Sequence, residues 1–263
     1  MTRVIKKEKI HSVDPRLKRC IEHDSESKRF AFNTIGRKLV SANHSRHIPI
    51  LDQGQLGSCT GNAGIGALGT DPLFRTLPTN TTYTLNENGA VQLYSSAEVI
   101  DGSGPYPPND NGSSGLSIAK ALVNAQMISG YQHTFTLNDA LLALGTNPIL
   151  VGINWYENMF TPDKDGRVHP TGALAGGHEI VARQIDVANK RVWFDNSWGT
   201  TWGVQGKFYL TFDDFGTLLS QQGDVVVLIP KNQPAPIPTP SVKDTNDIAL
   251  AAAMKAWITA KGL

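Results

Sequence analysis

The chain has 263 residues, of which 40% are hydrophobic, and its 24 basic and 23 acidic side chains give a formal net charge of +1. That size fits one large domain or two small ones, and the balanced charge gives no reason to expect nucleic acid or an anionic membrane as a partner. No stretch approaches the roughly 20 apolar residues of a membrane span. The charged residues 1–10 lack the apolar centre of a secretory signal. We expect a cytoplasmic protein in a reducing compartment, with a virus-encoded or virion-associated setting also open.

The first 47 residues are polar and rich in charge, with few apolar side chains beyond Val13, Leu17, Ile21 and the stretch 30–32. Too little apolar surface is present for a separate core. We expect an N-terminal extension over residues 1–47 that wraps around the main body or is trimmed near the basic pair Lys28–Arg29.

From residue 48 to about 145, apolar side chains recur mainly at helical spacing. The predicted helices cover residues 59–68, 91–100 and 116–127. The density of Gly and Pro between Asp101 and Gly115 predicts an exposed loop between the second and third of these helices.

From residue 148 the pattern changes to short apolar runs typical of strands. The predicted strands cover residues 149–153, 180–185, 191–194, 207–212 and 224–229. Helices first and strands second predict an α+β fold with a helical lobe at about 48–145 and a β-rich lobe at about 146–230. Ligand sites favour such a boundary, so we expect the active site in the cleft between the lobes.

The last part of the chain differs from the rest. Residues 231–243 form a Pro-rich linker, and residues 244–263 predict an amphipathic helix. A single helix of this size is marginal in water. We therefore expect it to dock either on the parent domain or on a protein partner, and the sequence does not distinguish the two.

The strongest chemical signal is Cys59, which stands where a Gly-bearing loop gives way to the first predicted helix. The partial positive charge of a helix N-terminus favours thiolate over thiol. Gln53, six residues earlier, offers an amide that could donate to the oxygen of a carbonyl under attack by the sulfur. Alone, this arrangement would also fit a small buried thiol.

Two later motifs supply what a thiolate nucleophile lacks. His178 follows two glycines at the start of an apolar, strand-like run, and Asn196 ends the next strand in the motif Asn-Ser-Trp-Gly. The six other histidines lie in polar or turn-rich surroundings. His44 and His47 are close in sequence, but no Cys or carboxylate cluster supports a metal site.

Together these motifs resemble the papain-like cysteine peptidases, over roughly residues 48–230. The order Gln, Cys, His, Asn, the Gly-His pair and the Asn-Ser-Trp-Gly motif followed by Trp-Gly all fit that family. The resemblance implies a papain-like two-lobe fold and an endopeptidase that needs no cofactor and acts on polypeptides. Leu56 stands where plant and lysosomal members have a disulfide-forming Cys, and Cys20 and Cys59 are the only thiols. This pattern is similar to the disulfide-free branch found in bacteria and their viruses.

The resemblance also implies the catalytic roles. Cys59 would be the nucleophile and His178 its proton partner, with Asn196 orienting the imidazole under the shielding ring of Trp198. Gln53 and the backbone N–H of Cys59 would form the oxyanion hole. Many members carry a long inhibitory pro-segment across the cleft, and residues 1–47 look too short to be one.

Substrate contacts are implied by the same resemblance. The family pairs an extended substrate with a glycine-rich strip, here Gly112, Ser113, Ser114 and Gly115. Further substrate-binding positions are Gly152, Gly177, Glu179 and Trp198. Glu179 follows the proposed catalytic His, where the family usually has a small apolar residue. Its carboxylate could favour a basic side chain two residues before the scissile bond, or it could turn away and pair with Arg183.

Other functions fit parts of the pattern. A relative acting on a special amide, such as the peptide of peptidoglycan, would use the same residues. Transglutaminases and amidases share the order Cys then His, but they do not predict Gln53 or the Asn-Ser-Trp-Gly motif. A catalytically silent structural or virion protein would not need all four of the proposed catalytic residues.

Overall fold

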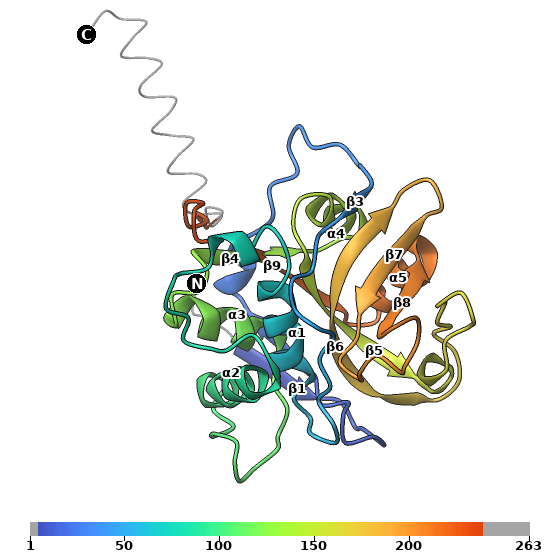
Figure 1. The fold of residues 1–263 in the computed structure, drawn as a ribbon, viewed down its shortest axis with the longest axis horizontal. Coiled ribbons are helices and arrows are strands. Elements are labelled where there is room, and N and C mark those ends of the chain that lie inside the picture. Colours follow the sequence, from blue (N-terminus) through green and yellow to red (C-terminus); the bar gives the residue numbers. More distant parts are fainter. Residues whose placement is uncertain (1–4, 239–263) are drawn as a thin grey trace, which may run out of the picture.

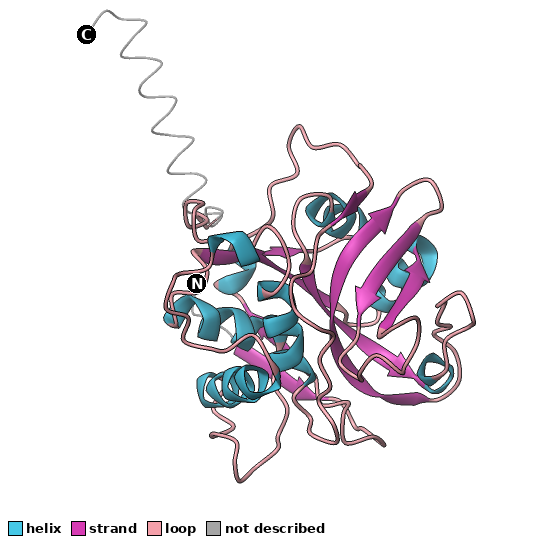
Figure 2. Cartoon of the chain, in the orientation of Figure 1, coloured by secondary structure: helices cyan, strands magenta, loops and turns pink. Residues whose placement is uncertain are grey.

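The computed structural model describes residues 5–238, and these form helices packed beside a long, twisted sheet (Figures 1 and 2). The helices are α1 (Cys59–Leu68), α2 (Glu87–Ile100), α3 (Gly115–Asn124), α4 (Leu137–Leu144) and α5 (Phe212–Ser220). The strands of the first half are β1 (Ile5–Lys9), β2 (Cys20–Asp24), β3 (Ala42–Asn43) and β4 (Gly130–Thr134). Those of the second half are β5 (Ile149–Tyr156), β6 (Leu174–Asp186), β7 (Arg191–Asp195), β8 (Lys207–Thr211) and β9 (Asp224–Ile229). The prediction of an α+β fold is confirmed.

The sheet is antiparallel and runs in the order β4-β9-β5-β6-β7-β8, with β3 added to β6. The β5–β6 pairing places Ile153 opposite His178 and Gly152 opposite Glu179. Strand β9, the last of the described strands, lies between β4 and β5. It therefore brings Asp224, at its start, opposite Gly152.

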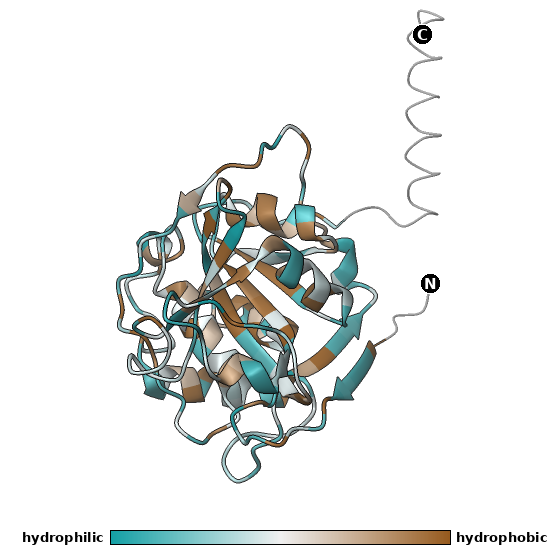
Figure 3. Cartoon of the chain, turned by 90° about the vertical axis from the view of Figure 1, so that its right-hand side faces the viewer, coloured by the Kyte–Doolittle hydropathy of each residue, from teal (hydrophilic) through white to brown (hydrophobic). Residues whose placement is uncertain are grey.

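Two hydrophobic cores lie on the two sides of strands β5 and β6. Ile149, Val151 and Ile153 belong to a core with α4 and α5, whereas Leu150 faces a core with α1, α2 and α3. This alternation is the period of two expected of a strand buried on both faces. Figure 3 shows the apolar strands enclosed by more polar helices and loops.

Helix α1 is buried along its whole length, which explains its run of small residues. A Cβ atom added at Gly61 would lie 2.2 Å from the backbone oxygen of Ala90 in α2. The two helices thus meet backbone against backbone, and the close packing fixes the position of Cys59 at the first turn of α1.

Three differences from the predicted elements stand out. The strand expected over 207–212 ends at Thr211, whose hydroxyl accepts the backbone N–H of Asp214 and starts α5. Helix α4 was not among the predicted helices, and it packs into the core that contains α5 and Ile149, Val151 and Ile153 of β5. Strands β1 and β2 form a separate hairpin within the N-terminal 47 residues.

The predicted C-terminal helix and the last five residues of the linker before it, 239–243, lie outside the described residues. Among the helices of residues 5–238, none is long and apolar enough to cross a membrane.

Candidate active site

Three segments bring Cys59, His178 and Asn196 together. Cys59 opens α1, His178 lies within β6, and Asn196 directly follows β7. His178 Nε2 lies 2.8 Å from Asn196 Oδ1, whereas its Nδ1 has no hydrogen-bond partner among the described residues. The backbone N–H of Glu179, next to His178, interacts with the thiol of Cys59.

Aromatic rings enclose the imidazole. The ring of Trp198 lies 4.9 Å from that of His178 at a tilt of 31°, and Trp155 approaches edge-on at 5.0 Å. Trp155 also contacts Trp198, with 5.1 Å between the ring centroids. Because His178 and Asn196 are almost fully buried, water has little access to the hydrogen bond between them.

Gln53 ties the loop before α1 to the loop that carries Asn196. Its Oε1 accepts the hydroxyl of Ser197 at 2.7 Å, and its backbone N–H donates to the Ser197 carbonyl at 2.9 Å. Its Nε2 donates to the carbonyls of Leu56 at 2.8 Å and of Arg16 at 3.0 Å. Arg16 belongs to the N-terminal extension. The side-chain amide of Gln53 therefore donates to a backbone carbonyl of the chain's own extension.

Residues 12–20, which we call the cover segment, run between the helical side and the strand side of the site. The Arg19 N–H donates to the Gly177 carbonyl at 3.1 Å, and the Cys20 N–H donates to the Ser113 carbonyl at 2.7 Å. Earlier in the segment, the Val13 N–H donates to the Ala175 carbonyl. Residues 1–47, which look too short for a long inhibitory pro-segment, thus still place residues 12–20 against both sides of the site.

Glycines allow the cover segment to lie this close. A Cβ atom at Gly112, which has a φ of +78°, would stand 2.0 Å from the Lys18 carbonyl oxygen. One at Gly177 would stand 2.8 Å from the Arg19 carbonyl oxygen. The positions predicted to admit a substrate backbone thus admit the backbone of the chain itself.

The side chain of Arg19 is fully buried in a pocket that also holds Glu179 and Asp224. Its Nε donates to Asp224 Oδ1 at 3.0 Å, and its Nη2 donates to the same oxygen and to the Gln222 carbonyl. Glu179 Oε2 lies 3.9 Å from the Arg19 Nε. A Cβ atom at Gly152 would stand 2.2 Å from the same Nε, so only glycine leaves room for the guanidinium.

Glu179 faces this pocket and not Arg183, which instead binds Asp195 at 3.1 Å. Both carboxylate oxygens of Glu179 are buried and accept no hydrogen bond from the described residues. Burial, and next the nearby Asp224, raise the pKa of Glu179 well above its usual range, while Arg19 opposes them. The two carboxyl oxygens of Glu179 are therefore hydrogen-bond acceptors in the pocket that Arg19 does not use.

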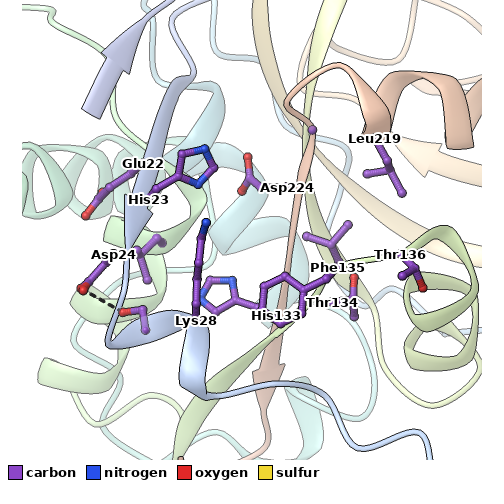
Figure 4. A pocket seen from close by; sticks show the side chains of 14 residues that line it. Glu22, His23, Asp24, Lys28, His133, Thr134, Phe135, Thr136, Leu219 and Asp224 are labelled. Carbon is purple, nitrogen blue, oxygen red and sulfur yellow. Dashed lines mark hydrogen bonds between the residues drawn. The ribbon is translucent and has the colours of Figure 1, made fainter. Parts of the chain in front are cut away.

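A cavity of about 130 Å³ adjoins this pocket, and five of its 14 lining residues belong to the N-terminal extension (Figure 4). Glu22, His23 and Lys28 line one side, and His133 and Asp224 line the other. Asp224 is thus shared between the cavity and the pocket that holds Arg19.

Burial keeps the thiol and the imidazole neutral in this arrangement. It raises the pKa of Cys59 to about 12 and lowers the pKa of His178 to about 4. The prediction of a thiolate stabilised by the helix N-terminus therefore does not hold while the cover segment is in place, because desolvation outweighs the other contributions.

The remaining predicted substrate positions lie around the same segment. Gly115 faces Glu179, since a Cβ atom there would stand 2.4 Å from the Glu179 Oε1. Ser114 caps α3 by accepting the Ser117 N–H, and its hydroxyl donates to Glu22 of β2. Ser114 thus binds the extension beyond the cover segment.

Two contributors were not predicted from the sequence. Asp224 was read only as the start of a strand. The basic residues of the cover segment were read as part of a surface extension, although a run of Arg16, Lys18 and Arg19 does signal an acidic binding surface. Within residues 5–238, no group of three His, Cys, Asp or Glu side chains could hold a metal ion.

Three solved structures that are similar to this chain are named as cysteine proteases or as a procathepsin. Xylellain, a cysteine protease from Xylella fastidiosa, superposes with a TM-score of 0.60 at 18% identity over 76% of this chain and 91% of its own. The chain has a papain-like fold. Digestive procathepsin L 3 of Tenebrio molitor gives a TM-score of 0.56 at 16% identity, covering 78% of this chain and 74% of its own. The Carica candamarcensis cysteine protease CMS1MS2, solved with E-64, gives 0.52 at 15% identity, with 72% and 99% covered.

Sequence comparisons add nothing to this papain-like likeness. No known protein family matches the sequence, and no curated protein matches it. The identities of 15–18% to the three solved structures establish the fold and leave activity to be argued from the site.

Proposed function

We propose that the protein is a cysteine endopeptidase that uses Cys59, His178 and Asn196 to hydrolyse peptide bonds. The observation that carries the proposal is the hydrogen bond from His178 to Asn196, enclosed by Trp198 beside the first residue of α1. A buried Asn that fixes one imidazole nitrogen leaves the other free for proton transfer to and from a thiol. The names of the papain-like neighbours, xylellain and CMS1MS2, describe cysteine proteases, which supports the same chemistry.

In the proposed reaction, the Cys59 sulfur attacks a substrate carbonyl after its proton passes to His178 Nδ1. The resulting oxyanion would accept a hydrogen bond from Gln53 Nε2 and from the Cys59 N–H. The C–N bond then breaks, the amine leaves with the proton from His178, and a thioester remains. Water hydrolyses that thioester with His178 as the base.

The described arrangement is a closed form of this enzyme. The carbonyl oxygen of Arg16 accepts a hydrogen bond from Gln53 Nε2, in the place that the substrate oxygen would take. The cover segment passes from Trp198 toward Ser113 in its N-to-C direction. By the resemblance to papain-like peptidases, substrate residues before the scissile bond lie along Ser113 and Glu179. The cover segment thus runs opposite to a substrate, which explains why it can fill the site without being cut.

The pocket around Glu179 and Asp224 would receive the substrate side chain two residues before the scissile bond. In the closed form it holds a fully buried arginine paired with Asp224. The buried Glu179 and Asp224, whose side chain is 26% exposed, favour a guanidinium there, because a neutral side chain would leave Asp224 without its ion pair. Cleavage of a peptide library by the wild type and by Glu179→Ala tests this, and an unchanged preference at that subsite would count against it.

Intact-mass labelling with an epoxysuccinyl inhibitor tests the proposed activity. The chain is first nicked with a trace of trypsin to open the cover segment, and peptide mapping then locates the adduct. We expect one adduct on Cys59 in the wild type, none in Cys59→Ala although Cys20 remains, and slow labelling in His178→Ala. A nicked wild type that takes no label and cleaves no peptide would overturn the proposal in favour of a silent structural protein.

A further inference from the structure

A buried tyrosine of α2 contacts the stretch of chain that we expect to pair with a substrate backbone. This stretch, residues 111–113, which we call the substrate strip, ends the loop that joins α2 to α3 (Figure 1). The side chain of Tyr94 is fully buried. A Cβ atom added at Gly61 of α1 would stand 2.8 Å from the Tyr94 Cβ. Tyr94 therefore connects the substrate strip to the helix that begins at Cys59.

The hydroxyl of Tyr94 has three hydrogen-bonding neighbours. It accepts the backbone N–H of Gly112 at 2.8 Å, and its oxygen lies 2.6 Å from Asp110 Oδ1 and 2.9 Å from Glu98 Oε1. Glu98 Oε1 also accepts the backbone N–H of Asn111 at 2.7 Å. Two amides of the substrate strip are thus held by Tyr94 and Glu98, which lie four residues apart on one face of α2.

The three side chains Tyr94, Glu98 and Asp110, which we call the tyrosine cluster, need one proton more than the hydroxyl supplies. A tyrosine hydroxyl has a single proton, which it can donate fully to only one of the two carboxyl groups. If both were ionised, one of the contacts at 2.6 and 2.9 Å would place two oxygen lone pairs against each other. One of the two carboxyl groups is therefore protonated.

The surroundings favour Glu98 as the site of that proton. Asp110 Oδ2 accepts from the Lys18 Nζ at 2.8 Å and from the Gly57 N–H at 3.1 Å, so its negative charge is compensated. Glu98 is fully buried, and its Oε2 accepts no hydrogen bond from the described residues. A buried carboxylate without such partners is costly, and protonation removes the cost.

The charges around Glu98 point the same way. Burial raises the pKa of Glu98, and the nearby Asp110 and Asp101 raise it further, against the hydrogen bonds that it accepts. Asp101 is paired with Lys7 at 2.8 Å. The titratable groups that face the tyrosine cluster from other elements are Lys7 and Lys9 of β1, Lys18 and Cys20 of the extension, and Tyr106 of the loop. An ionised Glu98 would add a third negative charge at this end of α2.

We propose that Tyr94 and a protonated Glu98 are positioning residues, which fix the backbone of the substrate strip so that it can pair with an extended substrate beside Cys59. The proposal rests on the proposed peptidase function. The strip already pairs with an extended backbone in the closed form, where the Ser113 carbonyl accepts the Cys20 N–H at 2.7 Å. Tyr94 and Glu98 are both fully buried, so they act on a substrate only through the strip.

The tyrosine cluster also reaches the loop before the proposed nucleophile. Asp110, which is bonded to Tyr94, accepts the N–H of Gly57, two residues before Cys59. The cluster therefore holds the substrate strip and the nucleophile loop at a fixed spacing. Loss of the hydroxyl would loosen both connections.

The protonated carboxyl group makes the hold on the strip dependent on pH. Protonated Glu98 can donate to Tyr94 and accept from the Asn111 N–H with the same oxygen, whereas an ionised Glu98 can only accept. Its folded-state pKa lies above that of an unfolded glutamate, about 4.3. The stabilisation is therefore complete below the unfolded value and is lost as the pH rises through the folded one.

Carbon-13 NMR of the glutamate carboxyl groups tests the protonation of Glu98. The sample is the full-length Cys59→Ala chain, and the signal that disappears when Glu98→Gln is added identifies Glu98. We expect that signal to keep the chemical shift of a protonated acid above about pH 4.3, where glutamates of an unfolded chain ionise. Ionisation of Glu98 at or below that pH would overturn the proposal.

Amide hydrogen exchange in the same Cys59→Ala chain tests the positioning. Tyr94→Phe removes the acceptor of the Gly112 N–H, so the protection of that amide should fall by about tenfold or more. Tyr106→Phe is the matched control, because that ring lies 6.1 Å from Tyr94 and its hydroxyl forms no hydrogen bond with the described residues. Glu98→Gln stays neutral, so the protection of Asn111 should no longer decline as the pH rises. A Tyr94→Phe protein with parental protection, or a Glu98→Gln protein with the parental pH dependence, would contradict the proposal.

Peptide cleavage by the trypsin-nicked chain with Cys59 present connects the tyrosine cluster to function. Tyr94→Phe should raise KM by about tenfold and change kcat less than about threefold, because the strip binds the substrate backbone away from the reacting bond. Tyr106→Phe should change neither constant. A merely structural role would lower the fraction of active enzyme, and a loss confined to kcat would therefore overturn the inference.

The outcomes separate the two proposals. A nicked wild type that takes the epoxysuccinyl label on Cys59, together with a Tyr94→Phe protein of parental KM, would overturn this inference and leave the proposed function standing. If the nicked wild type neither takes the label nor cleaves peptides, the proposed function itself has failed. The carboxyl and amide measurements need no activity, so they still decide whether Tyr94 and Glu98 hold the strip.

Discussion

Two arginines three residues apart hold the cover segment by different physics. Arg16 keeps 24% of its side chain exposed, stacks its guanidinium 4.2 Å from the ring of Trp198 and pairs with Asp14. Arg19 is fully buried and pairs with Asp224. A cation on an aromatic face contributes about 0.5–1 kcal/mol at an exposed site, whereas breaking a buried ion pair costs about 3–5 kcal/mol. The comparison predicts that Arg19 contributes most of the energy that holds the cover segment and that Arg16 contributes little.

The largest effect should come from Arg19→Ala. Loss of the buried guanidinium removes the counter-charge of the partly exposed Asp224 and the packing of Arg19 beside Glu179, so the free energy of unfolding should fall by about 3 kcal/mol. Urea denaturation in a Cys59→Ala background measures that loss. With Cys59 present, inhibitor labelling of freshly purified protein should be about tenfold faster, since about 1.4 kcal/mol suffices for that factor. Labelling at the parental rate would show that the segment is anchored elsewhere.

The two carboxylates of the Arg19 pocket should differ in importance. Asp224 accepts from both Nε and Nη2 of Arg19, so Asp224→Asn should cost about 2–3 kcal/mol of folding free energy. Glu179 has a raised pKa and accepts no hydrogen bond from the described residues. The nearly isosteric Glu179→Gln should therefore cost less than about 1 kcal/mol. The same urea assay ranks them, and the reverse order would mean that Glu179 is the main partner of Arg19.

Acid should destabilise the closed form through two buried histidines, His178 and His133. Burial lowers the pKa of His178, beneath Trp198, and of His133, beside the Asp224 cavity, to about 4. An unfolded histidine titrates near about 6.5, so the unfolded chain binds more protons between these values and stability falls as the pH drops from about 6.5 to 4. Each histidine contributes at most roughly 3 kcal/mol. Urea midpoints of Cys59→Ala across this range measure the slope, and His133→Gln should flatten it.

The smallest effect should come from Arg16→Ala. The cation stacked on Trp198 is partly exposed and already paired with Asp14, so its loss should cost about 0.5 kcal/mol and change the labelling rate less than about threefold. Arg16 is also a positive charge that lowers the pKa of His178. The variant should therefore move the His178 pKa upward in a titration followed by NMR. An effect as large as that of Arg19→Ala would show that the two arginines contribute equally to holding the cover segment.

The sequence predicted the parts of the site that short motifs define. Gln53, Cys59, His178 and Asn196 each stand beside neighbours that restrict their local structure, such as the two glycines before His178. Thr211 followed by Asp213 and Asp214 is also a helix-start signal, and α5 does begin there. The predicted strand over 207–212 included Thr211 and so missed this signal.

The cover segment could not be predicted in the same way. Arg19 and Asp224 are 205 residues apart in sequence, and no local pattern reports a contact between them. Their pairing depends on β9 lying next to β5, which places Asp224 opposite Gly152.

The buried, neutral state of Cys59 also protects the protein from oxidants. Peroxide attacks thiolates far faster than thiols, and a thiol with a pKa of about 12 is almost entirely protonated at neutral pH. While residues 12–20 cover it, the sulfur is therefore chemically inert as well as catalytically silent. Sensitivity to sulfenic acid formation would begin only when the cover leaves, so the thiol that we propose as the nucleophile would pass through an oxidative episode intact.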